Sequence, residues 1–156
     1  SDALVERLTL ESDVSVREII LTTLTRLGDE VAVRGLIDCL RSEDVSLRNE
    51  AIEAMKQLPD EVAPIMRTLL SYQDSVVRFF AVNILESLRH PQVEEWLIEV
   101  IECDSHLNVC GAAVDLLGEA GTSRSLDALE CLKQRFADEP YIQFAAALAM
   151  KHIGRN

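Results

Sequence analysis

A short phrase that recurs at a nearly constant interval constrains this chain most. Asp13-Val14-Ser15-Val16-Arg17 consists of Asp, two spacer residues, an aliphatic residue and Arg, and the same pattern begins again at Asp44 and Asp74. The interval is about 30 residues, which is typical of proteins built from stacked structural repeats. The pattern therefore predicts a repeat architecture in which each phrase opens a helix.

Alignment on Arg17, Arg48 and Arg78 extends the pattern to five rows, with Cys110 and Gln143 at the matching place in the last two. Apolar residues recur one place before this column and three, seven and ten places after it. That spacing predicts one buried stripe on an α-helix in every row. The four columns are Val16, Leu47, Val77, Val109, Ile142; Ile20, Ala51, Ala81, Ala113, Ala146; Leu24, Met55, Leu85, Leu117, Met150; and Leu27, Leu58, Leu88, Ala120, Ile153.

Shorter amphipathic segments lie between these helices, at residues 4–8, 33–40, 62–70, 93–101 and 126–136. Each repeat is therefore expected to be an antiparallel helix pair, and the second helices are expected to stop at Gly28, Pro59, Arg89, Gly121 and Gly154. The predicted repeats are 1–28, 29–59, 60–89, 90–121 and 122–156. Since no pair can bury its apolar stripe alone, the prediction is one all-α domain, an α-solenoid over 1–156 with a continuous core.

The phrase, the small residue three places after Arg and the period resemble HEAT repeats, most closely the short bacterial kind known as PBS-lyase HEAT-like repeats. The phrase is clear in three rows and degrades in the last two, where His106 and Cys110, then Glu139 and Gln143, replace Asp and Arg. The resemblance implies a right-handed superhelix whose second helices line a concave, partner-binding side. It also implies two alternatives to a binding scaffold, a phycobilin lyase that handles bilin chromophores and a purely structural slice of a longer repeat protein.

The amino-acid composition limits the partners and the cellular location that can be expected. The formal net charge is −12, and an acidic surface disfavours nucleic acid and anionic membranes as partners. The charge either keeps the chain soluble or favours a basic partner. None of the four cysteines forms a CxxC pair, which favours reduced thiols and a cytoplasmic location. No apolar run approaches the length of a membrane span, and no signal peptide is visible.

The recurring acids and arginines have a structural interpretation and a functional one. An Asp just before a helix caps its free amides, and an Arg can reach an Asp of the neighbouring repeat, so that a ladder runs along the stack. Ser15 and Glu18 offer an alternative cap for the first second helix. The functional alternative is a row of Arg that binds a carboxylate ligand. The residues of the ladder are Asp13, Arg17, Asp44, Arg48, Asp74 and Arg78.

Signals for an enzyme are poor, and we expect no catalytic residue, cofactor or metal. HEAT-like deoxyhypusine hydroxylases hold iron with repeated His-Glu pairs, whereas no His of this chain precedes Glu. HEAT-like DNA glycosylases present a basic concave face, whereas this chain is acidic. Cys103, His106 and Cys110 straddle one turn and have zinc-ligand chemistry, but the alternative, two small apolar fillers and a residue at a helix cap, is favoured.

The outward rows of the second helices predict a partner-binding groove across the last three repeats. Phe79 and Phe80 are adjacent and point about 100° apart on a helix, so both cannot lie in the middle of the buried stripe. Small residues in the fourth row would leave room beside them, with acidic and amide side chains at the rim. The predicted site is Phe79, Phe80, Asn83, Glu86, Gly111, Asp115, Glu119, Phe144 and Leu148.

The expected partner of this groove is a protein or peptide, with an apolar residue in the dip and basic residues at the rim. The alternative is that Gly111, Ala112 and Gly118 let helices pack closely and leave no dip. In that alternative, a further repeat or another copy of the chain, stacked end to end, covers Phe144 and Leu148.

Overall fold

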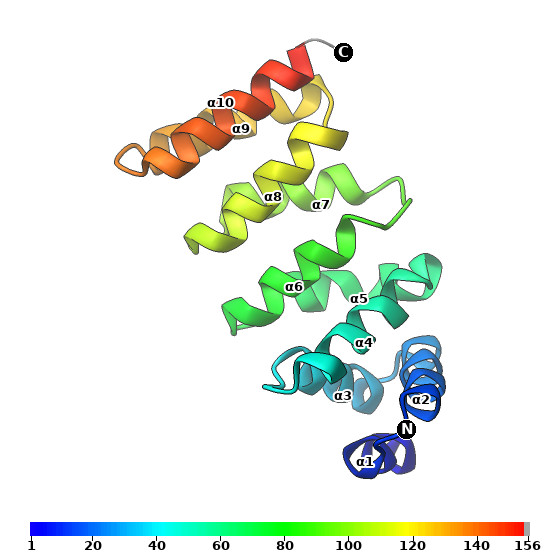
Figure 1. The fold of residues 1–156 in the computed structure, drawn as a ribbon. Coiled ribbons are helices and arrows are strands. Elements are labelled where there is room, and N and C mark those ends of the chain that lie inside the picture. The colour runs from blue at the N-terminus through cyan, green and yellow to red at the C-terminus, as the bar shows by residue number, and fades with distance from the viewer. Residues whose placement is uncertain (155–156) are drawn as a thin grey trace. The chain divides into compact units, whose positions relative to one another are not determined.

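The computed structural model describes residues 1–154, and within this range all regular secondary structure is helical. The elements, labelled in Figure 1, are α1 (Asp2–Leu10), α2 (Val14–Leu27), α3 (Glu30–Leu40), α4 (Val45–Lys56), α5 (Pro59–Leu70), α6 (Ser75–Leu85), α7 (Val93–Cys103), α8 (Leu107–Ala120), the short 3-10 helix η1 (Ser123–Ser125), α9 (Leu126–Arg135) and α10 (Pro140–Gly154).

Consecutive helices pack in pairs, α1 with α2, α3 with α4, α5 with α6, α7 with α8 and α9 with α10. One helix pair lies within each predicted repeat range, apart from Pro59, which opens α5 instead of closing the second repeat. The division into these repeats within a single domain stays a prediction. The all-α solenoid fold is confirmed. The chain forms two compact units, unit 1 (Ser1–His90) and unit 2 (Pro91–Asn156). A continuous core through all five repeats stays a prediction. None of the described helices is both long and apolar enough to span a membrane.

The predicted aspartate caps are confirmed. Asp13 accepts a hydrogen bond from the Val16 amide at 3.2 Å, and Asp44 accepts one from the Leu47 amide, also at 3.2 Å. Asp74 caps α6 in the same way, through the Val76 amide at 2.9 Å. Each carboxylate thereby satisfies an amide that has no partner within the helix. The N-cap of α2 is therefore Asp13, and the alternative cap at Ser15 is wrong.

The predicted helix ends are only partly right. Gly28 closes α2 at φ 60°, in the left-handed region that favours glycine. Gly121 follows α8 in an extended conformation, so a left-handed cap there is wrong. It stays glycine for a steric reason, since a Cβ would lie 2.5 Å from the Leu117 carbonyl oxygen. The end predicted at Arg89 is also wrong, because α6 stops at Leu85 and turns follow.

The buried stripe is wider than predicted. The column three places after the Arg column is buried in all five rows, as expected. The next column is buried too, at Leu21, Ile52, Val82 and Val114, and the sequence pattern missed it. Val16, Leu27 and Ala120, all predicted to be buried, are exposed.

A carboxylate in unit 2 ties α7 to the turn before α9. Glu94 Oε1 accepts hydrogen bonds from the Thr122 amide at 2.6 Å and from the hydroxyls of Thr122 and Ser125, each at 2.8 Å. Burial raises the pKa of Glu94, but these donors outweigh it and hold the pKa below the ordinary value of 4.5. The link therefore depends on an ionised carboxylate.

Glu94→Gln is expected to lower the free energy of unfolding near neutral pH, because a neutral amide oxygen is the weaker acceptor. The folded pKa of Glu94 is depressed, so its contribution is complete above the unfolded value of 4.5 and is lost as pH falls through the folded pKa. Urea denaturation at about pH 7 and about pH 3 should show the variant and wild type converging in acid. Glu95→Gln, on an exposed side chain of the same turn, is the control; a gap for Glu94→Gln that persists in acid would contradict the prediction.

Candidate functional site

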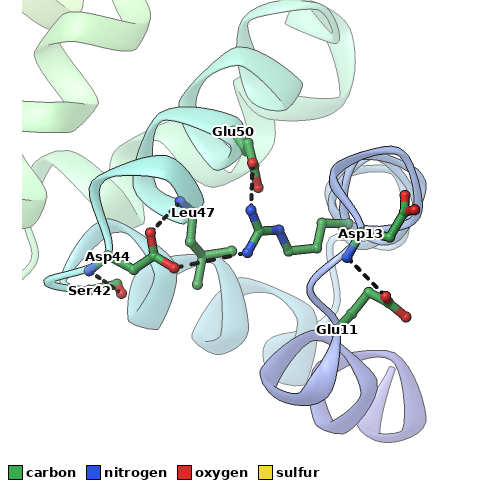
Figure 2. Close-up of polar contacts among 7 residues, drawn as sticks. Glu11, Asp13, Ser42, Asp44, Leu47 and Glu50 are labelled. Atoms are coloured by element: carbon green, nitrogen blue, oxygen red, sulfur yellow. Dashed lines mark hydrogen bonds and ion pairs between the residues drawn. The ribbon is translucent and has the colours of Figure 1, made fainter.

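The arginine column serves the stack, and Arg17 is its clearest member. Arg17 Nη2 lies 2.7 Å from Glu50 Oε1, and Nη1 lies 3.9 Å from Asp44 Oδ2. Figure 2 shows Glu50, on α4, and Asp44, at the N-cap of α4, joined to this guanidinium by dashed lines. The predicted ion pair between Arg17 and Asp44 is therefore present. Glu50, which the sequence analysis did not propose as a partner, lies closer to Arg17.

The other two arginines turn back onto their own repeats. Arg48 Nη1 donates to the Ser42 carbonyl at 3.1 Å, and Arg78 Nη1 donates to the carbonyls of Tyr72 and Gln73, each at 2.9 Å. These carbonyls belong to the turn before each helix. Asp74 pairs instead with Arg41, at 3.0 Å. The predicted regular ladder, from each Arg to the Asp of the next repeat, is thus replaced by different partners in each row. These contacts occupy the guanidiniums, which the functional interpretation had assigned to a carboxylate ligand.

The Cys103, His106 and Cys110 cluster is dispersed around the end of α7. Cys103 is exposed, whereas Cys110 is buried and donates its thiol to the Asp104 carbonyl, with Sγ 3.1 Å from the oxygen. His106 stands at the cap position of α8, and its amide donates to Asp104 Oδ1 at 2.9 Å. Over residues 1–154, no group of three or more His, Cys, Asp or Glu side chains is arranged to hold a metal ion.

Arg135 closes the end of α7, a role that the sequence pattern missed. Its guanidinium donates to the carbonyls of Ile101 at 2.7 Å, Asp104 at 2.8 Å and Glu102 at 2.9 Å. The carbonyls at a helix C-terminus lack partners within the helix and carry partial negative charge, so a cation is the group that suits them. Arg135 lies more than 30 residues further along the chain, and no local signal could have assigned it to this end.

Phe79 and Phe80, on α6 in unit 1, are both half-buried, as their adjacent positions predicted. The rings meet edge to face, with centroids 5.5 Å apart, and the Arg48 guanidinium lies 5.0 Å from the centre of the Phe80 ring. Asn83, on the same helix, is half-buried, and Glu86, at the C-cap of that helix, is exposed. The Arg48 cation holds Phe80 in place, and each ring keeps an accessible part.

The room predicted beside the small residues of α8 is filled. Gly111 is buried, and a Cβ there would lie 2.5 Å from the Tyr141 ring. A Cβ on Gly118 would lie 3.3 Å from the Ala149 Cα. The two glycines thus let α10 approach α8 closely, as in the alternative interpretation, and the predicted dip beside them is wrong.

The surface of unit 2 instead carries an apolar stripe on α10. Tyr141, Phe144 and Leu148 have exposed fractions of 50%, 70% and 42% and follow one another at intervals of three and four residues. Residues at these intervals share one side of a helix. We call these three residues the α10 stripe. The sequence predicted Phe144 and Leu148 but missed Tyr141. Only positions after the Arg column were considered as outward-facing, and Tyr141 stands two places before that column.

Two carboxylates border the α10 stripe on the neighbouring helix. Asp115 and Glu119, which we call the α8 acidic pair, lie one turn apart, and both are exposed. Partial burial and the charge of Glu119 raise the pKa of Asp115, and partial burial and Asp115 raise the pKa of Tyr141. Neither carboxylate has a salt-bridge partner among the described residues. The pair is therefore a locally uncompensated negative charge.

The nine residues of the predicted groove are divided between the two units. Phe79, Phe80, Asn83 and Glu86 belong to unit 1, whereas Gly111, Asp115, Glu119, Phe144 and Leu148 belong to unit 2. A single groove that joins the two sets stays a prediction. Unit 1 also has a surface depression of about 440 Å³ between α3 and α5, which are the first helices of the second and third repeats. The sequence did not indicate this depression. Its apolar lining includes Val33, Ile37, Pro64 and Ile65.

Comparison with known protein families identifies the repeats of this chain. Residues 1–79 and residues 62–151 each match the family model for HEAT repeats, so the matches together cover nearly all of the chain. No curated protein matches the sequence. The closer relation to PBS-lyase HEAT-like repeats stays a prediction. With helix pairs in every predicted repeat and the family model matched in both halves, the chain belongs to the HEAT-repeat family.

Proposed function

We propose that this protein is a non-enzymatic scaffold that binds other proteins through the surface of its second helices. HEAT repeats commonly serve as protein-interaction scaffolds. The observation that carries the proposal is the α10 stripe, in which Phe144 is 70% exposed. A large aromatic side chain on the surface is costly to leave in water and is the residue type that concentrates binding energy at interfaces.

The chemistry of the second helices favours a basic protein or peptide. Their exposed acidic side chains include Glu53, Asp115 and Glu119, and the whole chain carries a formal net charge of −12. Such a surface attracts basic segments and speeds their association. It repels phosphate and anionic lipid, so nucleic acid and membranes are not part of the proposal.

The proposed location is the cytoplasm, where thiols stay reduced. All four are free thiols, as cytoplasmic thiols are. Burial raises the pKa of Cys39 to about 12, so this thiol is protonated at neutral pH and packs as a small apolar side chain. The thiol of Cys110 is engaged by a backbone carbonyl.

Affinity capture with the intact protein, followed by mass spectrometry, tests the proposal. Phe144→Ala is expected to lose specific partners and to keep the unfolding midpoint of wild type, because its side chain is largely exposed. Leu10→Ala removes a similarly exposed side chain, 75%, from α1, which is a first helix, and is the control. Phe79→Ala and Phe80→Ala, measured separately for capture and unfolding, test unit 1. If none of these variants changes the captured set relative to Leu10→Ala, the second-helix surface is not a binding surface.

A further inference from the structure

The α10 stripe lies on a side of its helix that, one repeat earlier, contacts another helix. Phe144 and Lys151 stand one and eight places after the Arg column in the fifth row, where the fourth row has Gly111 and Gly118. Both glycines lie against α10, Gly111 at Tyr141 and Gly118 at Ala149. By this correspondence, Phe144 projects from the surface of α10 where a further helix would lie. The geometry of the repeat thus indicates a helix as the occupant.

The residues at these positions differ from the two glycines that let α10 pack directly against α8. Gly111 and Gly118 let α8 and α10 approach closely, because a Cβ added at either glycine would lie within 3.3 Å of an atom of α10. In α10 the corresponding side chains are Phe144 and Lys151, which hold a neighbouring backbone at a distance. An occupant must therefore meet Phe144 with side chains of its own, in the manner of an amphipathic helix on a hydrophobic surface.

Charge selects among helices of this kind. The Tyr141 ring packs on Gly111, one turn before Asp115 on α8, so the α8 acidic pair lies beside the α10 stripe. Asp115 and Glu119 repel each other, and no described cation neutralises either. A second copy of the chain would bring the same acidic pair and a net charge of −12, whereas Lys or Arg side chains would relieve the repulsion.

We propose that the α10 stripe and the α8 acidic pair form a docking site for a basic amphipathic helix of a partner protein. Apolar side chains of that helix pack on Phe144 and Leu148, and a Lys or Arg one or two turns away pairs with Asp115 and Glu119. Tyr141 stands between the two parts and offers its ring face to the aliphatic stem or the cation. This inference rests on the proposed scaffold function and names the partner's chemistry at one surface of it.

Selection from a display library of randomised helical peptides on the intact protein tests the site. The enriched peptides are expected to carry an apolar stripe flanked by Lys or Arg. Their affinity, measured by fluorescence anisotropy, should fall about tenfold for Asp115→Asn/Glu119→Gln and for Phe144→Ala. Their salt dependence should also weaken in the charge variant, since fewer ions pair. Asp127→Asn/Glu130→Gln removes the same charge from the exposed surface of α9 and should leave the affinity unchanged.

Several outcomes would overturn the docking site. They are the absence of enriched peptides, enrichment of neutral or acidic ones, and equal affinity losses for the α8 and α9 charge variants. The affinity capture separates this inference from the scaffold function. Partners that are lost with Phe80→Ala but kept by Phe144→Ala would overturn the docking site and leave the scaffold standing, whereas the lack of any specific partner would overturn both.

Discussion

Arg17→Met is expected to lower the free energy of unfolding by about 3 kcal/mol. The side chains of Arg17 and Glu50 are only 12% and 17% exposed, and their charged atoms lie 2.7 Å apart between neighbouring repeats. Met keeps most of the aliphatic volume but removes the cation, so the largely buried Glu50 carboxylate is left without its counterion. Its other oxygen, Oε2, already lacks a hydrogen bond. Urea denaturation followed by circular dichroism measures the loss.

Two further variants separate the buried pair from a general effect of charge. Arg34→Met breaks the ion pair with Glu30, which has a similar length of 2.8 Å but side chains that are 68% and 85% exposed. This variant should lower the free energy of unfolding by less than about 0.5 kcal/mol. Arg17→Met/Glu50→Leu removes both buried charges and should recover much of the stability, because no carboxylate is left unpaired. Equal losses for Arg17→Met and Arg34→Met would show that the contact between repeats is no stronger than an ordinary surface pair.

Trp96→Ala is expected to destabilise unit 2 by about 4 kcal/mol. Trp96 is 1% exposed and is the largest fully buried side chain among the described residues. It lies on α7, which packs against both α8 and α9. Truncation to Ala removes the apolar area of the indole and leaves a cavity among side chains that collapse only in part. Amide hydrogen exchange should therefore become faster in α7, α8, α9 and α10.

Trp96→Phe is the matched control and should cost less than half as much, because the benzyl ring fills most of the indole site. Trp96 is the only tryptophan of the chain, so its wild-type fluorescence reports the unfolding of unit 2. Exchange in unit 2 that matches wild type would contradict the prediction. Equally faster exchange in α2 and α4 would show that all five repeats unfold together, as the predicted continuous core requires.

The helix pairs and their caps could be predicted because the forces that set them act within a few residues. Asp13 bonds to an amide three residues later, and an apolar period of 3.6 residues marks a buried helix side whatever the rest of the chain does. Errors at this level also had local causes. Gly121 looks like a left-handed cap by its place, but the constraint on it is the nearby Leu117 carbonyl.

The partners across repeats could not be predicted, because one phrase can reach several different groups. Arg17 binds Glu50 of the next repeat, whereas Arg48, in the same column, binds the turn before its own helix. The separation of Arg17 and Glu50 along the chain is 33 residues, and only stacking brings the two charges together. The choice between them depends on small offsets between helices that the column pattern does not contain.

For the candidate site, the sequence indicates which side chains are available, whereas the packing of the helices sets which of them meet solvent. Phe144 and Leu148 were predicted to be outward and are exposed. Gly111 was predicted to leave an opening, but a small residue specifies only that a neighbour can come close, and Tyr141 does so. Space beside a residue is a property of the packed neighbours and not of the residue. That is why the repeat, the helices and their aspartate caps followed from the sequence, whereas the candidate site required the fold.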